Sequence, residues 1–158
     1  MHVPTNSGEA LVIGIYLTAL TDEARLQKIV TDFSELPSVG SIFIRTHPTE
    51  VVNTDLSGII DQDGPVEMSC TRPLDEDIAR TDIAVCGNST VTIELLHGGR
   101  PVLYDQRLDQ IDFDYNGYAG HGLVLAYPDT LNDGIFNLAR QHYQSCLLYT
   151  SPSPRDRS

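Results

Sequence analysis

The sequence predicts an α/β domain built on a doubly wound parallel sheet of about six strands. Short apolar runs alternate with amphipathic stretches from residue 10 to residue 145. A run such as Ile83–Cys86 contains no alternating polar residues, which is typical of a strand buried on both faces of a parallel sheet. Glycine and small polar residues separate each run from the next stretch. We therefore expect one sheet with the strand order 3-2-1-4-5-6.

The first third of the chain predicts a central strand, a helix and a second strand. The apolar run Ala10–Leu17 is the expected first strand, and the polar residues 1–9 read as a linker or a truncated edge. Asp22 is placed to cap a helix with apolar residues at intervals of three and four. Ser41–Arg45 follows as the second strand. The expected buried stripe of the helix is Ala24, Leu26, Ile29, Val30 and Phe33.

The middle of the chain predicts shorter elements. Residues 51–64 are polar and predict a short helix or an irregular loop, and Val66–Cys70 predicts a weaker third strand. Pro73 is expected in the first turn of a short helix, where proline is favoured. The three acidic residues 75–77 would then lie near the positive end of the helix dipole. Arg72 is expected on the surface.

A sharp turn and a helix follow the fourth strand, Ile83–Cys86. Gly87 allows the turn, and Asn88 or Ser89 can cap the first helical turn, whose N–H groups lack partners inside the helix. Gly98-Gly99 ends the helix before a fifth apolar run. The helix should pack on the sheet through Val91, Leu95 and either Ile93 or Leu96.

The last third predicts a sixth strand, Leu123–Ala126, and a final helix. Asp129 and Thr130 can cap this helix, whose buried stripe should contain Ile135, Leu138 and Ala139. Before the strand, residues 105–121 contain four aspartates, but their spacing matches no calcium loop. We expect hydrogen bonding to ligand hydroxyl groups there and no metal.

The final residues resemble a translated sequencing adapter. Residues 146–158 can be encoded by a transposon-type sequencing-library adapter read in frame. We therefore expect the native chain to stop near Gln144 or Ser145, the domain to span residues 10–145, and the protein to be a fragment of a longer one. The remaining tail is expected to be non-native or disordered.

Composition narrows the function classes. The chain has 158 residues, 41% of them hydrophobic, which is one domain's worth of sequence. A net charge of −12 argues against a nucleic-acid or membrane-surface binder, because both need a basic face. The absence of a signal-like start predicts a cytoplasmic location. The three cysteines are widely spaced, so neither a disulfide framework nor a zinc site is indicated.

Two segments carry candidate binding chemistry. Free N–H groups, the helix dipole and the adjacent hydroxyls of Ser89 and Thr90 meet where a parallel strand ends, which suits a phosphate. Glu94 shares a helix face with Thr90 and is placed to accept hydrogen bonds from a ribose diol. Arg45 and His47, at the end of the second strand, offer further donors to a phosphate. A plain helix cap and a simple turn are the structural alternatives.

The segment from Gly87 to Val102 resembles the donor-binding segment of GT-B-fold glycosyltransferases. Those proteins have a Gly-x-Ser-Thr-x-x-x-Glu-like turn and helix followed by Gly-x-Pro-Val. In that family the turn holds the donor phosphates and the glutamate holds the ribose. The matching residues are Gly87, Ser89, Thr90, Glu94, Gly99, Pro101 and Val102.

The second segment strengthens the resemblance. Arg45-x-His47-Pro48, followed some forty residues later by the Ser-Thr helix tip, is similar to bacterial sialyltransferase-like and capsule glycosyltransferases, and to CDP-glycerol glycerophosphotransferases. In these families the histidine and hydroxyl residues grip the phosphate of a nucleotide-activated donor.

The resemblance implies the donor-binding C-terminal half of a transferase that makes surface or capsular polysaccharide. His47 would be catalytic by stabilising the leaving phosphate, with a CMP-, CDP- or UDP-linked sugar as donor and no metal or other cofactor. The acceptor would bind a missing N-terminal domain, so the fragment is expected to be inactive alone. The full-length protein could associate peripherally with the inner membrane. The implied substrate-binding residues are Arg45, Gly87, Asn88, Ser89, Thr90 and Glu94.

Three alternatives stay open. CDP-alcohol phosphotransfer is close to the leading interpretation. A nucleotide-sugar epimerase shares the fold, although that family has a doubled acid where this chain has Glu94-Leu95. A non-catalytic α/β binding domain would use Ser89 only as a cap. A nicotinamide or flavin enzyme is disfavoured, because the first strand–helix loop lacks Gly-x-Gly-x-x-Gly.

Overall fold

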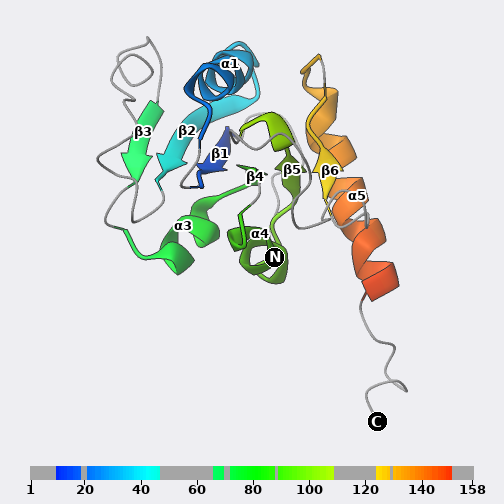
Figure 1. Ribbon diagram of the computed structural model, residues 1–158. Helices are drawn as coiled ribbons and strands as arrows, with labels where there is room; N and C mark the ends of the chain where they lie inside the picture. Colours follow the sequence, from blue (N-terminus) through cyan, green and yellow to red (C-terminus); the bar gives the residue numbers. More distant parts are fainter. Residues whose placement is uncertain are drawn as a thin grey trace.

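A computed structural model shows six strands in one sheet between two layers of helices (Figure 1). It describes residues 10–18, 21–46, 66–69, 72–87, 89–108, 124–128 and 130–150. The elements are β1 (Leu11–Tyr16), α1 (Glu23–Ser34), β2 (Val39–Arg45), β3 (Val66–Ser69), α3 (Leu74–Arg80), β4 (Ile83–Cys86), α4 (Val91–His97), β5 (Val102–Tyr104), the 3-10 turn η1 (Gln106–Leu108), β6 (Leu125–Ala126) and α5 (Gly134–Thr150).

The strand order is β3-β2-β1-β4-β5-β6, and every neighbouring pair is parallel. This confirms the predicted fold class and the predicted order. Strand β1 lies in the interior of the sheet, between β2 and β4. Because all strands run in one direction, they all end at the same edge, which we call the C-terminal edge.

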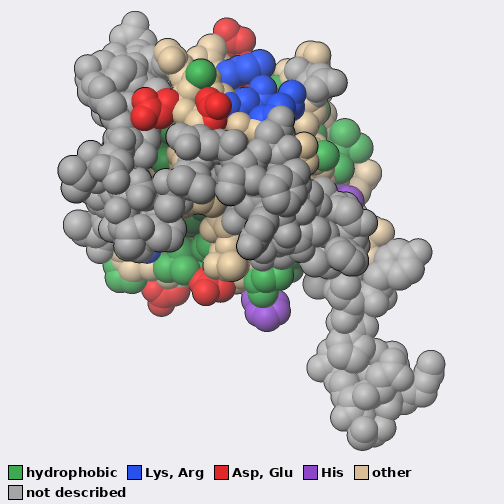
Figure 2. Space-filling model, in the orientation of Figure 1, with side chains coloured by type: hydrophobic (Ala, Val, Ile, Leu, Met, Phe, Trp, Pro, Cys, Tyr) green, Lys and Arg blue, Asp and Glu red, His purple; other side chains and the backbone are tan. Residues whose placement is uncertain are grey.

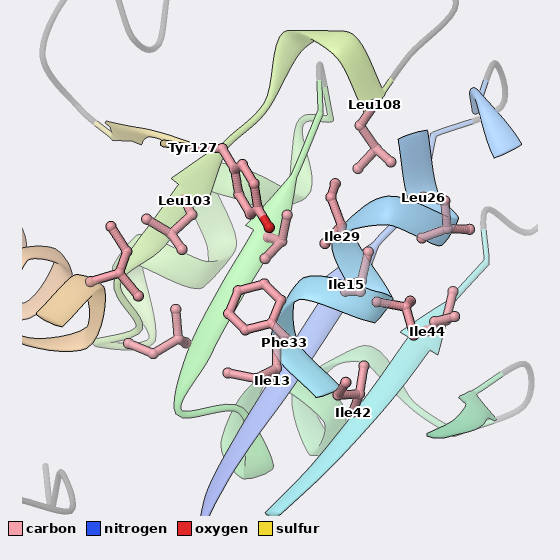
Figure 3. Close-up of a cluster of buried hydrophobic side chains, with 14 of the residues drawn as sticks. Ile13, Ile15, Leu26, Ile29, Phe33, Ile42, Ile44, Leu103, Leu108 and Tyr127 are labelled. Carbon is pink, nitrogen blue, oxygen red and sulfur yellow. The ribbon is translucent and has the colours of Figure 1, made fainter. Parts of the chain in front are cut away.

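One face of the sheet is covered mainly by α1. Side chains of β1 such as Ile13 and Ile15 pack there against the fully buried Leu26, Ile29 and Phe33 of the helix (Figure 3). Each such side chain contributes about 1.5–3 kcal/mol when it leaves water. The predicted helix is confirmed, with Asp22 as its cap: Oδ1 accepts a hydrogen bond from the Arg25 N–H at 3.0 Å. The one departure in the stripe is Ala24, which is exposed.

The opposite face is covered by α3 and α4. Its core contains Tyr16 and Phe43, whose rings meet edge to face at 5.7 Å between centroids. Gly14 lies beneath this pair, and a Cβ there would come within 2.7 Å of Phe43 Cζ, 2.8 Å of Thr81 Oγ1 and 2.9 Å of Tyr16 Cε1. The two aromatic rings therefore require glycine at position 14.

Two helices differ in detail from the sequence prediction. In α4 it is Leu96 that packs on the sheet, while Ile93 is 37% exposed. In α5 the predicted core residue Leu138 is 56% exposed, and Phe136 is buried instead. The helix begins at Gly134, whose N–H donates to Asn132 Oδ1, so Thr130 is not its cap. Its core-facing residues are Ile135, Phe136 and Ala139. The other proposed cap, Asp129, lies outside the described residues.

Helix α5 spans one side edge of the sheet, beside β6 (Figure 1). Its first turns pack into the α1 face through Ile135, Phe136 and Ala139, whereas the Tyr143 hydroxyl donates to Leu96 O of α4 at 2.9 Å. The helix continues to Thr150, five residues beyond Ser145, because no helix breaker occurs before Pro152. The adapter origin of residues 146–158 stays a prediction. Among the described residues, no helix is both long enough and apolar enough to cross a membrane.

Two tyrosines are buried with their hydroxyls bonded. The Tyr16 hydroxyl is 2.7 Å from Thr81 Oγ1, and the Tyr127 hydroxyl donates to Asp32 Oδ2 at 3.2 Å. Burial raises the pKa of both phenols above the ordinary value, and the nearby Asp32 charge raises that of Tyr127 further. Both groups are therefore held in the neutral form.

Replacement of Gly14 by alanine should destabilise the protein. The new methyl group must displace the ring of Phe43 or Tyr16, and overpacking of this kind costs about 1–3 kcal/mol in the free energy of unfolding. Urea denaturation measures the change. The matched control is Gly134→Ala, whose Cβ would come 2.9 Å from Oδ1 of the exposed Asn132 side chain, which can turn into solvent. Loss of that hydrogen bond and the higher helix propensity of alanine offset each other, so the expected change is within about 0.5 kcal/mol. Equal effects of the two substitutions would contradict the packing described.

Stability should fall under alkaline conditions. Because the folded-state pKa of Tyr16 and Tyr127 is raised, their contribution is complete below about pH 10 and is lost as the pH rises above it, where the unfolded chain ionises first. Urea unfolding at pH 8 and pH 11 measures the loss. A variant with both tyrosines replaced by phenylalanine should lose less over the same interval; an equal loss would show that these two phenols are not responsible.

Candidate functional site

Two predicted binding segments lie on either side of the end of β1. Tyr16, the last residue of β1, is paired in register with Arg45 of β2 and with Cys86 of β4. Neighbouring strands are about 4.8 Å apart, so the backbones of Arg45 and Cys86 are separated by about 10 Å. The Leu17 N–H donates to Arg45 O at 2.9 Å and extends this pairing to the C-terminal edge. Arg45 and the Gly87 turn therefore belong to the same edge.

The β4–α4 turn carries the predicted hydroxyl residues. Gly87 is buried, and its carbonyl accepts the Ser89 N–H at 2.9 Å. Ser89 Oγ accepts the Val91 N–H at 3.2 Å, so Ser89 caps the first turn of α4, as the structural alternative predicted. A hydroxyl that accepts one hydrogen bond still has its own hydrogen to donate. Asn88 lies outside the described residues.

Thr90 and Glu94 are exposed on α4. Thr90 directly precedes the helix, and its side chain makes no capping hydrogen bond. Glu94 lies one turn further along, and the two share a helix face because they are four residues apart. Their side chains are therefore open to solvent beside the Gly87 turn. The predicted ribose contact of Glu94 stays a prediction.

Arg45 has an ion-pair partner that the sequence analysis did not identify. Its Nη1 atom donates to Asp77 Oδ2 at 2.8 Å and to Arg72 O at 2.6 Å. The side chain is 20% exposed, so the guanidinium lies at the surface of the edge and not in the core. His47 and Pro48, two and three residues further on, lie outside the described residues, and their predicted roles stay predictions.

Asp77 is the centre of a polar cluster between β2, β3 and α3. Its carboxylate is fully buried, accepts a hydrogen bond from Ser69 Oγ, and lies 3.0 Å from Arg80 Nε and 3.4 Å from Arg72 Nε. The Arg80 guanidinium is held in turn over the Phe43 ring, 4.0 Å from its centroid. We call Arg45, Ser69, Arg72, Asp77 and Arg80 the Asp77 cluster.

A sequence signal for the burial of Asp77 did exist. The sequence pattern predicts Asp77 only as one of three acids near the positive end of the helix dipole. However, Asp77 is three residues after Leu74 and one before Ile78, both of which pack against the sheet. That spacing puts the carboxylate on the inward face of α3. An acid on an apolar helix stripe requires paired cations, and the nearby arginines supply them.

A second polar cluster lies at the end of β5. The buried Asp105 carboxylate accepts a hydrogen bond from Arg25 Nε of α1 and is 3.3 Å from Arg107 Nε. The Arg25 guanidinium also lies over the Tyr127 ring, 5.3 Å from its centroid. Figure 2 shows Lys and Arg side chains gathered at the top of the view, over α1 and the neighbouring turn η1. The rest of the aspartate-rich segment, residues 109–121, lies outside the described residues.

The C-terminal edge can therefore bind an anion between two segments. On the β2 side it presents a guanidinium fixed by a buried carboxylate. On the β4 side it presents a glycine turn followed by two hydroxyls, Ser89 and Thr90. The strand order reverses between β1 and β4, and open α/β sheets bind ligands at such a switch point. Within the described residues, no three His, Cys, Asp or Glu side chains are grouped to hold a metal.

This chain is similar to known proteins in structure but not in sequence. No family model and no curated protein sequence matches the chain. Among solved structures, the glycotransferase of kitacinnamycin is similar over 90% of this chain, with 16% identity and a TM-score of 0.54. The wall teichoic acid polymerase TagF, soaked with CDPG, is similar over 92% of this chain, with 14% identity and a TM-score of 0.51.

The chain spans well under half of each of these proteins, 41% of the first and 38% of the second. At such low identity the likeness shows the fold alone. The fold of this chain is accordingly a Rossmann-like α/β domain, and part of each of these two structures has a similar fold.

Proposed function

We propose that the chain is the donor-binding half of a glycosyltransferase that moves a sugar from a nucleotide-activated donor to a surface or capsular polysaccharide. The observation that carries the proposal is the register at the end of β1. It has Arg45 on one side and Cys86, which precedes the Gly87 turn, on the other. A diphosphate bound over the end of β1 could then interact with both segments.

The chemistry of the proposal needs anion stabilisation. An acceptor hydroxyl attacks the sugar carbon, the bond to the donor phosphate breaks, and negative charge develops on the leaving phosphate. Preformed donors directed at that charge lower the barrier, because they need no reorganisation when it appears. In this proposal Arg45, His47, Ser89 and Thr90 supply donors, Gly87 and Asn88 let the backbone approach, and Glu94 holds the ribose.

The acceptor and the general base belong, in this proposal, to a part of the enzyme outside this chain. The chain matches only about two fifths of either similar structure, which supports a role as one half of a larger enzyme. We therefore expect the fragment to bind a donor nucleotide without transferring the sugar. In this proposal the protein is cytoplasmic, and the full-length enzyme contacts the inner membrane peripherally.

One observation favours a second candidate, transfer of a phosphoalcohol from a CDP-linked donor. TagF, one of the two similar structures, was soaked with CDPG. The same hydrogen-bond donors at the C-terminal edge would serve this reaction, because its donor substrate also contains a nucleotide diphosphate. Competition between CDP-alcohol and UDP- or CMP-sugar donors for the chain distinguishes the two candidates.

Thr90→Val should weaken nucleotide binding without changing stability. The substitution keeps the shape of the side chain and removes a hydroxyl that caps nothing. A hydrogen bond to a charged phosphate is worth about 1.5–3 kcal/mol, so the dissociation constant for CDP should rise about tenfold or more. Calorimetric titration of the 158-residue chain with CDP, UDP and CMP measures it, and urea denaturation checks the stability.

Thr31→Val is the matched control, because Thr31 is an exposed helical threonine on α1. It should bind as the unchanged chain does. The proposal fails if the unchanged chain binds none of the three nucleotides, or if Thr90→Val and Thr31→Val bind equally well.

A further inference from the structure

The geometry points to Asp77 as a positioning residue for nucleotide binding, acting through Arg45. The inference rests on the proposed function and assigns a role to a carboxylate that does not itself reach the ligand. Asp77 is fully buried beneath the C-terminal edge, whereas the side chain of Arg45 is 20% exposed. The ion pair between them therefore joins a buried anchor to a donor at the surface.

Among the described residues, no hydrogen bond is made by Nε or Nη2 of Arg45. Both of its hydrogen bonds within the described part of the chain are made by Nη1, to Asp77 Oδ2 and to Arg72 O. A guanidinium carries five N–H donors in a rigid planar fork, so fixing Nη1 also fixes the directions of Nε and Nη2. These remaining donors suit the bidentate recognition of a phosphate.

Asp77 is itself held in place from several directions. Ser69 Oγ of β3 donates to Oδ2, and Arg80 Nε lies 3.0 Å from Oδ1. The backbone of Arg45 is fixed separately, because its carbonyl accepts the Leu17 N–H from β1. With both its main chain and one guanidinium nitrogen fixed, Arg45 loses little side-chain freedom when a phosphate binds.

Charge and position predict opposite effects of removing this carboxylate. The Asp77 cluster contains three guanidinium groups and one carboxylate. On charge alone, Asp77→Asn would make the edge more positive and would tighten the binding of an anion. If Asp77 acts by positioning Arg45, the same change frees the guanidinium and weakens binding. A purely structural role would change stability and leave the affinity unaltered.

Asp77→Asn should raise the dissociation constant for CDP about threefold to tenfold, which is the usual effect of freeing one long side chain. Its affinity for cytidine, which has no phosphate, should not change. Asp75→Asn is the matched control: the same substitution in the same helical turn, at an exposed carboxylate with no arginine partner among the described residues. It should bind CDP as the unchanged chain does.

A double-mutant cycle tests whether Asp77 acts through Arg45. In an Arg45→Gln background, Asp77→Asn should cause no further loss of CDP affinity, because the two changes interrupt one interaction. Additive losses would overturn the inference. So would unaltered or tighter CDP binding by Asp77→Asn alone, although the proposed function would then stand. An unchanged chain that binds no nucleotide would overturn both proposals.

A measurement on the unchanged chain covers the case in which Asp77→Asn fails to fold. Nitrogen-15 spectra of the ligand-free protein should show separate, slowly exchanging guanidinium signals for Arg45, and these signals should shift when CDP is added. Fully averaged Arg45 signals would show a freely rotating side chain and would overturn the inference.

Discussion

The burial of β1 on both faces is the constraint on which the rest of the structure depends. Ile13 and Ile15 face α1, while Gly14 and Tyr16 face the α3 and α4 layer. A strand with no polar side to offer to solvent must lie inside the sheet, with a neighbour on each side. Parallel pairing to β2 and β4 meets that need and brings Arg45 and Cys86 to the two sides of Tyr16. The candidate site is thus a consequence of how the core is filled.

Features that depend on a few consecutive residues could be predicted from the sequence. The Asp22 cap, the turn at Gly87 and the helix end at Gly98-Gly99 are examples, and Gly99 adopts the left-handed conformation that such an end favours. The strand order could also be predicted, because strands that alternate with helices indicate a Rossmann-like domain, in which 3-2-1-4-5-6 is the usual order. The start of α5 was missed, because a loop that could be capped at several polar residues gives no unique signal.

The ion pairs of the candidate site could not be predicted in the same way. Arg45 and Asp77 are 32 positions apart in the chain, and Arg25 and Asp105 are 80 apart. Only the folded sheet brings such partners together. The sequence alone identified Arg45 as a hydrogen-bond donor. It could not identify Asp77 as the partner of Arg45, and Asp77 was described only as an acid near a helix end. Thr90 and Glu94 were identified from their shared helix face and from the resemblance, and both side chains are exposed.

The structural and functional interpretations of Ser89 and Arg45 are compatible. Ser89 accepts a hydrogen bond as a cap and retains its hydroxyl hydrogen, and Arg45 pairs with Asp77 through one nitrogen of three. The most direct measurement is a crystal structure of the 158-residue chain with CDP. The account predicts the diphosphate over the end of β1, within hydrogen-bond distance of both Arg45 and Thr90. A diphosphate bound at the opposite edge of the sheet, or in contact with neither residue, would contradict it.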